Sequence, residues 1–354
     1  MSIFSVPGIL TRILIFTSLI QLTACSSLGY LVHTSTGHLQ MMGQRQAIDE
    51  LIKSDNTDPN EKIALKEVLQ IRKFASSDLL LPDNNSYTSY VELDRDYVTW
   101  AVFAAESLSL NAKTWCFLVV GCVPYRGYFS QDKAWQFTQQ LQAKGYDTYI
   151  APVPAYSTLG WFSDPLLSSM LGRGSIITAE YIFHELAHQK LYIKNDTAFN
   201  EAFATAVGQI GVEKWLLSKG MDKSLQNYLN ANQNKHEIYQ IIDTLKQQLQ
   251  DIYQSSADNE QKLTLKDIAL DEYRQTMTKQ LQAWNKLQQY QSWLLDDMNN
   301  AKLNAFSTYR DLVPLFIDLY QRCNEDIAKF YQAVDRMRVL DKNLRIKHLQ
   351  DAQC

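Results

Sequence analysis

The sequence lacks several features that would settle its class at once. Its five cysteines include no CxxC pair, which argues against a cysteine-based zinc site. No apolar run reaches the roughly 20 residues of a membrane-spanning helix, and no repeat or low-complexity segment is present. Lysine and arginine (34) are outnumbered by aspartate and glutamate (38), so nucleic acid is not expected as a partner. The 354 residues, 46% of them hydrophobic and 20% charged, have instead an ordinary globular composition.

The N-terminus follows the pattern of a bacterial export signal. Arg12 precedes a ten-residue apolar run, 13–22, which is too short for a mature membrane span but suits a secretory signal. The run ends in "LTAC", which looks like a lipobox whose Cys25 is acylated, and Ser26 after it favours sorting to the outer membrane. The alternatives are a plain signal peptide and an uncleaved anchor. We predict a protein held in the cell envelope by an N-terminal lipid, at the outer membrane and facing the periplasm.

Four further cysteines remain for the exported chain: Cys116, Cys122, Cys323 and Cys354. An even number in an oxidising compartment favours disulfides, with three possible connectivities. Proximity in sequence favours Cys116–Cys122 and Cys323–Cys354. Buried free thiols are the alternative.

Hydrophobic periodicity predicts an α+β fold that is mainly helical, with a small mixed or antiparallel sheet and a C-terminal region of long helices. The expected helices cover 41–78, 131–145, 175–193 and 197–219, then two long helices, read as an antiparallel pair, within 222–304, and two more near the end. Two or three strands are expected within 88–130, and another from 146. The predicted divisions are a signal (1–24), a tether (25–40), a catalytic core (41–220) and a helical region packed on that core (221–354).

The stretch "IFHELAHQKLYI" (182–193) holds two of the six histidines, four positions apart. Side chains at i and i+4 lie on one face of a helix, so His184 and His188 can present two nitrogens to one ion. The motif HExxH on a helix is a zinc-hydrolase signature. The alternative is a helix whose histidines have this spacing by chance.

A third ligand is expected, because hydrolytic zinc takes three protein ligands and leaves one position for water. After the polar break "KNDT", a second helical segment begins, with Glu201 placed in its first turn. A helix hairpin would bring this carboxylate to the histidine face. The alternative for Glu201 is a glutamate favoured there by the helix macrodipole. One zinc ion per chain is predicted.

Glu185 stands between the histidines and is the expected general base. Zinc lowers the pKa of bound water, and an adjacent carboxylate can accept its proton and pass it to the departing amine. Glu180, one turn before His184, is a candidate to lie near the metal or to contact a substrate amine, with an ordinary surface glutamate as the alternative. Asp196 and Asn200 are candidate partners of the ligand histidines, with loop or cap roles as the alternative.

Five stretches resemble one family: "IFHELAHQKLY…DTAFNEAFA", "LPDNNSYTSYVEL", "KTWCFLVVGCVPYRGYFS", "YDTYIAPVPAYSTLGWFSDPLLSSML" and "NNAKLNAFSTYRDLVP". It is a family of predicted bacterial zinc aminopeptidases, lipoproteins grouped with gluzincin-like metallopeptidases, and the resemblance covers about 40–340. It implies a zincin-like fold with His184, His188 and Glu201 as metal ligands and Glu185 as base. The separation of His188 from Glu201 is shorter here than in thermolysin-like enzymes.

The substrate side of the site is less marked in the sequence. Tyr156, before the motif helix, is the first candidate to stabilise the oxyanion, followed by Tyr125 and Arg126; Trp161 and Phe162 are candidates for a side-chain pocket or for the core. The remaining histidines, His33, His38, His236 and His348, belong to no motif in the sequence and are treated as incidental.

The predicted function is therefore a zinc-dependent peptidase acting on peptides, an aminopeptidase by resemblance. The alternatives are a non-catalytic envelope lipoprotein with a metallopeptidase-like fold and a zinc amidase acting on cell-wall peptides. Intact His184, Glu185 and His188 favour an enzyme, because a binding module has no need of the base.

Overall fold

The computed structural model describes residues 29–30, 32–117, 121–308, 312–351 and 354. The expected signal and the expected lipidation site, Cys25, lie outside the described residues. The chain divides between Arg45 and Gln46 into two compact units, and in the first of them residues 29–30 and 32–43 are helical. In the part of the chain that is described, no helix is both long enough and apolar enough to cross a membrane.

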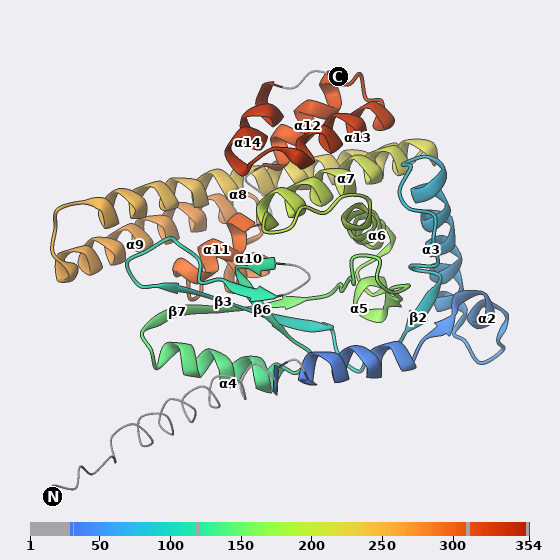
Figure 1. Ribbon diagram of the computed structural model, residues 1–354, viewed down its shortest axis with the longest axis horizontal. Coiled ribbons are helices and arrows are strands. Elements are labelled where there is room, and N and C mark those ends of the chain that lie inside the picture. Colours follow the sequence, from blue (N-terminus) through green and yellow to red (C-terminus); the bar gives the residue numbers. More distant parts are fainter. Residues whose placement is uncertain (1–28, 31, 118–120, 309–311, 352–353) are drawn as a thin grey trace, which may run out of the picture. The chain divides into compact units, whose positions relative to one another are not determined.

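The unit that begins at Gln46 is mainly helical, as expected. Its described strands are β1 (Gln46–Ala47), β2 (Ser89–Val91), β3 (Thr99–Glu106), β4 (Trp115–Phe117), β5 (Gly121–Val123), β6 (Tyr125–Tyr128), β7 (Tyr146–Val153) and β8 (Leu166–Leu167). Its described helices are α2 (Ile48–Lys53), α3 (Pro59–Ser77), α4 (Gln131–Gln142), α5 (Ser168–Leu171), α6 (Ser175–Lys190), α7 (Thr197–Ser218), α8 (Asp222–Gln254), α9 (Asn259–Ala283), α10 (Leu287–Leu294), α11 (Asn300–Thr308), α12 (Val313–Arg322), α13 (Ile327–Arg336) and α14 (Lys342–Asp351), with a 3-10 turn at Met337–Val339. Figure 1 shows this α+β arrangement.

The largest described sheet is antiparallel, in the order β6–β3–β7. All of its central strand β3 is buried except Glu106, because α4 lies on one face and α11 on the other (Figure 1). Ala101 and Phe103 of β3 pack with Ala301 and Ala305 of α11. The three alanines among them let the helix approach the sheet closely.

The expectation of two or three strands within 88–130 is wrong, since β2 to β6 all lie there. Three of them have only three residues, too few to show a clear alternation in the sequence. The pair β4–β5 is closed by a Cys116–Cys122 disulfide. β2 pairs in parallel with β8, about 75 positions later in the chain, a partnership that no local pattern could predict.

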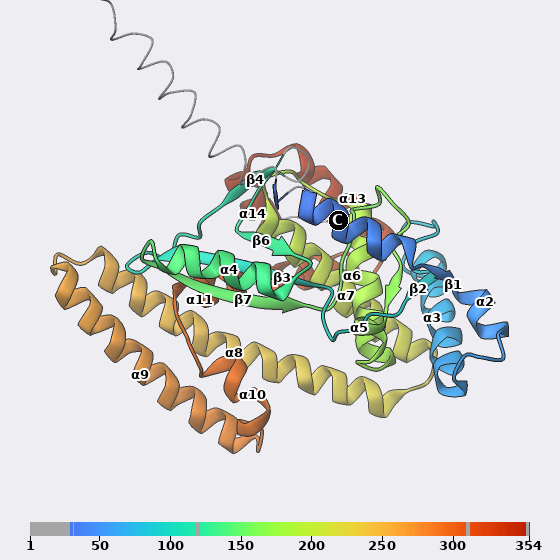
Figure 2. The ribbon, with the colours of Figure 1, turned by 90° about the horizontal axis from the view of Figure 1, so that it is seen from below.

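The expected antiparallel pair of long helices is confirmed as α8 and α9, which lie side by side in Figures 1 and 2. Ile242, Leu249 and Met277 belong to the buried core that joins them. The buried ammonium of Lys266 on α9 lies 2.8 Å from Asp147 Oδ2 of β7. This ion pair fixes the hairpin to the end of the sheet.

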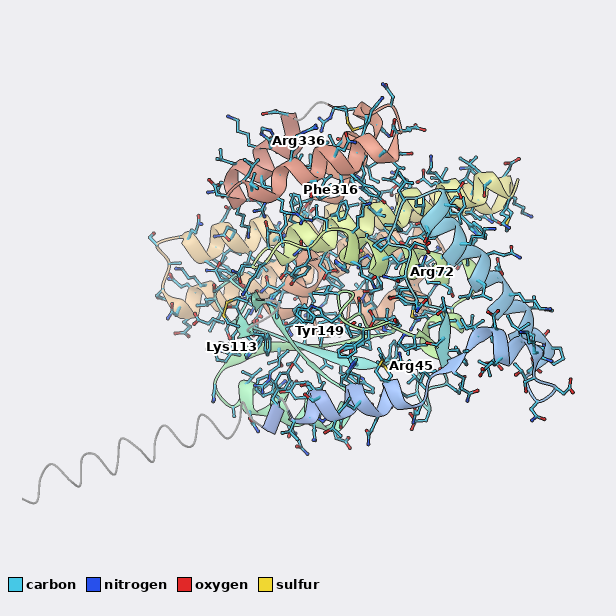
Figure 3. The ribbon with its side chains drawn as sticks, turned by 45° about the vertical axis from the view of Figure 1, so that its right-hand side comes forward. Arg45, Arg72, Lys113, Tyr149, Phe316 and Arg336 are labelled. Carbon is cyan, nitrogen blue, oxygen red and sulfur yellow. A yellow bond between two sulfur atoms is a disulfide. The ribbon has the colours of Figure 1, made fainter. Side chains whose placement is uncertain are left out.

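The C-terminal helices pack on α7 through aromatic rings. Phe316 of α12, labelled in Figure 3, lies 4.9 Å from Phe199 and 5.7 Å from Phe203 between ring centroids. Cys323 at the end of α12 forms a disulfide with Cys354. The structure therefore contains the two cysteine pairs that are closest in sequence, and the second one closes the chain end onto α12.

Helices α6 and α7 approach each other so closely that a glycine is required between them. A Cβ on Gly211 of α7 would lie 2.5 Å from a ring carbon of Phe183 and 2.8 Å from a methyl of Leu79. All of these neighbours are fully buried, so they have little room to move.

We expect Gly211→Ala to lower the free energy of unfolding by about 1–3 kcal/mol through overpacking, although alanine favours a helix over glycine by about 1 kcal/mol. Gly127→Ala in β6 is the matched control, because its Cβ would meet nothing within 4 Å. Urea unfolding of both variants measures the difference. A Gly211→Ala variant as stable as the unaltered chain would contradict the close-packing argument.

Candidate metal centre

The motif helix α6 begins after Gly174, whose φ of 87° lies in the left-handed region that glycine enters without strain. Ile182, Phe183, Leu186 and Ala187 are buried on it. The helix ends at Lys190, three residues earlier than expected, because the backbone turns extended at Leu191. The buried apolar face of α6 thus packs the motif helix into the core.

Helix α7 begins at Thr197 after its N-cap Asp196, whose side chain accepts a hydrogen bond from the Phe199 backbone N–H. Glu201 is the fifth residue of α7, one position beyond the first turn in which it was expected. The chain between the two helices is only six residues long, so α6 and α7 form the predicted hairpin.

The hairpin brings His184, His188 and Glu201 together as a group that could hold a metal ion. The two histidine Nε2 atoms are 3.1 Å apart, and Glu201 Oε2 lies 3.4 Å from each of them. Ligands at about 2.0–2.1 Å from a tetrahedral zinc lie about 3.3 Å from one another. The three atoms therefore have the spacing that a small tetrahedral ion requires.

The electrostatics of the group fit a cation as well. Burial raises the pKa of Glu201, but His188 and His184 beside it lower that pKa to about 2. Burial lowers the pKa of His188, and Glu201 raises it beyond that loss. Glu201 Oε2, which faces the Nε2 atoms of both histidines, is buried without a hydrogen-bond partner among the described residues. An anionic oxygen and two ring nitrogens converging in this way fit the donor set of zinc.

Glu185 follows His184 directly in the motif, and the surrounding charges shift the pKa of its carboxyl in both directions. Burial raises the pKa of its carboxyl, the two histidines lower it, and the negative charges of Glu201 and Asp164 raise it again. The net direction is upward, which suits a group that must accept a proton and then release it.

Tyr87 and Asp164 were not singled out in the sequence; both are fully buried and interact electrostatically with Glu185. Burial raises the pKa of the Tyr87 phenol well above its usual value, and the charges of Glu185 and Asp164 add to that rise, so the phenol stays protonated. The Tyr87 backbone N–H donates to the Asp164 carbonyl at 2.7 Å. Arg72, labelled in Figure 3, holds the preceding turn by donating to the Ser86 carbonyl at 2.8 Å. Both residues lie within stretches quoted for the family resemblance, which is the one sequence signal that could have pointed to them.

Thr205 is a further residue that sequence reasoning did not single out. Its hydroxyl lies 3.5 Å from His184 Nδ1, on the ring nitrogen that does not face Glu201. Thr205 is one helical turn after Glu201, a spacing that could have suggested it. Polar groups at this position orient a ligand imidazole.

The proposed partners of the histidines, Asp196 and Asn200, have structural roles. Asp196 caps α7. Asn200 donates to the Ile193 carbonyl at 2.7 Å and accepts from the Ile193 N–H at 2.8 Å. Both residues define the short connection between the two ligand-bearing helices.

The residues predicted to contact the substrate have different surroundings in the structure. The ring of Tyr156 packs against Phe129 at 5.3 Å, that of Tyr125 against Phe103 at 5.5 Å, and Arg126 lies over Phe137. Trp161 and Phe162 are 72% and 54% exposed, so they belong to the surface and not to the core. The oxyanion role of Tyr156 stays a prediction.

A cavity of about 510 Å³ opens beside Thr205. Glu180 and Gln209 line it from α6 and α7, and His236 and Tyr239 line it from α8. His236, which belongs to no sequence motif, thus lines this cavity. Glu180 places a carboxylate in this cavity one helical turn from His184.

A family model described as "Putative aminopeptidase" matches residues 29–349, which include every ligand of the candidate centre. No curated protein and no solved structure matches the chain. The chain belongs to this aminopeptidase family.

Proposed function

We propose that this protein is a zinc-dependent aminopeptidase with a zincin-like core. The observation that carries the proposal is the convergence of His184, His188 and Glu201 next to the half-buried Glu185. Membership of the aminopeptidase family supports a peptide as substrate.

His184, His188 and Glu201 would hold the ion. When bound there, zinc supplies Lewis acidity, which polarises a carbonyl and lowers the pKa of water. Glu185 accepts the proton of the attacking water, and its raised pKa lets it pass that proton to the departing amine. Thr205 keeps the His184 ring oriented, and Tyr156 is the proposed donor to the oxyanion.

The cavity beside Thr205 is the proposed binding site for the free N-terminus of the peptide substrate. An α-ammonium group needs an anionic partner in a confined space, and Glu180 offers its carboxylate there. Glu180 would thus select peptides with a free N-terminus.

We further propose that the protein is exported and lipidated at Cys25, and that it acts in the cell envelope at the outer membrane, facing the periplasm. The two disulfides support an oxidising compartment, since such bonds are rare in a reducing cytosol.

The test is digestion of a peptide library by the purified protein, read by mass spectrometry, with each peptide also supplied in N-acetylated form. We expect residues to be removed from free N-termini only, activity to stop with a chelator, and zinc to restore it. Equal internal cutting of both sets would contradict the aminopeptidase assignment. A zinc-loaded protein that cuts no peptide would contradict the peptidase function and favour the scaffold or amidase alternatives.

A further inference from the structure

The C-terminal helix α14 reaches the connection between the two ligand-bearing helices. Its Arg345 forms a buried ion pair with Asp196, the N-cap of α7. The two residues are 5% and 6% exposed, and they lie 149 positions apart in the chain. A contact of this kind ties the end of the chain to the start of the helix that carries Glu201.

Besides Asp196, the Arg345 guanidinium contacts two backbone carbonyls and an aromatic ring. Its Nη2 donates to the Leu340 carbonyl at 2.7 Å, and its Nε donates to the Met337 carbonyl at 3.3 Å. The guanidinium also lies 5.2 Å from the ring centre of Phe199. Any movement of the planar guanidinium would break several of these hydrogen bonds. Its position is therefore fixed, and so is that of the Asp196 carboxylate paired with it.

The two oxygens of Asp196 have separate tasks. One accepts from the Phe199 backbone N–H and starts α7, while the other meets Arg345. Asn195, just before it, has a left-handed φ of 67° and accepts from the Cys122 N–H at 2.9 Å. This irregular connection needs outside contacts to define where α7 begins.

We propose that Arg345 is a positioning residue of the metal centre, acting through Asp196 to set Glu201 against His184 and His188. The inference rests on the proposed function. Asp196 is five positions before Glu201, so a change at the helix start shifts the carboxylate relative to histidines on a different helix. A metal site tolerates displacements of only about 0.5 Å.

The same inference gives the C-terminal helices a role. Arg322 of α12 donates to the Gln350 and Leu349 carbonyls of α14 at 2.6 and 2.8 Å, and the Cys323–Cys354 disulfide lies at the same end. α12 in turn packs on α7 through Phe316. These contacts hold α14 so that Arg345 stays on Asp196.

The test uses the full chain with Arg345→Met and, separately, Asp196→Asn, which keeps an acceptor for the helix cap. We expect each variant to bind zinc about 10–100-fold more weakly, as is typical when the supports of metal ligands are lost. Zinc affinity is measured by chelator competition, and the visible spectrum of the Co²⁺-substituted protein reports ligand geometry. Arg345→Lys should recover part of the affinity.

Lys266→Met is the matched control, because it breaks another buried ion pair, between α9 and β7, that touches no ligand-bearing helix. We expect it to lower stability without changing zinc affinity or the Co²⁺ spectrum. If Arg345→Met and Asp196→Asn lose stability to the same degree and keep both zinc affinity and spectrum, the inference is overturned. Failure of the unaltered chain to bind zinc would overturn the proposed function itself, and the inference with it.

Discussion

Glu185→Gln is expected to keep its zinc and to lose peptide hydrolysis, with kcat lower by at least about 10²–10⁴-fold. The amide has nearly the size of the carboxylate but cannot accept the proton of the attacking water. Because Glu185 is not one of the three converging ligands, the metal should stay bound. Steady-state kinetics on an unblocked peptide and metal analysis of the same sample measure the two effects separately.

Glu213→Gln is a suitable control for this variant, since Glu213 is a half-buried glutamate on α7 outside the candidate centre. It should hydrolyse peptides like the unaltered protein. Full activity of Glu185→Gln would remove the general-base mechanism. Loss of zinc together with activity would instead make Glu185 a contributor to metal binding.

Glu201→Ala is expected to weaken zinc binding by more than about 100-fold. Losing a residue that only supports a metal ligand typically weakens binding by up to about 100-fold, and losing the ligand itself should cost more. The substitution removes the single anionic oxygen of the group and leaves His184 and His188 alone. Two neutral nitrogens cannot compensate the charge of the ion in a buried site. Activity should fall with the metal and return in part at high zinc concentration.

Chelator competition on Glu201→Ala, with Glu213→Ala as its control on the same helix, measures this loss. Unchanged zinc retention in Glu201→Ala would disprove the third-ligand assignment while leaving the histidine pair in place. That outcome would direct the search for a ligand to another part of the chain.

The HExxH motif shows how far local sequence can reach. Spacing alone put His184 and His188 on one face of a helix, because helical geometry repeats every 3.6 residues. The polar break after "KLYI" correctly predicted a second helix. Asp58 before Pro59 is another local signal of this kind, and α3 begins there. These features depend on residues that lie within a few positions of one another.

Helix ends and short strands were predicted less well. α6 stops at Lys190 although its apolar pattern continues to Ile193, because Asn200 holds the backbone of Ile193 in the connection. The pairing of β2 with β8 likewise depends on a partner far along the chain. Local patterns carry no record of such distant contacts.

The sequence by itself determined the mainly helical α+β class, the antiparallel pair α8–α9, and the residue types of the candidate site. Only the tertiary structure decided that Glu201 stands 3.4 Å from both histidine Nε2 atoms, that Tyr87 and Asp164 interact electrostatically with Glu185, and that Arg345 forms an ion pair with Asp196. The first set follows from periodicity and spacing, which are properties of the local chain. The second follows from packing between distant segments, where Gly211 lets α6 and α7 meet and the end of the chain fixes their connection.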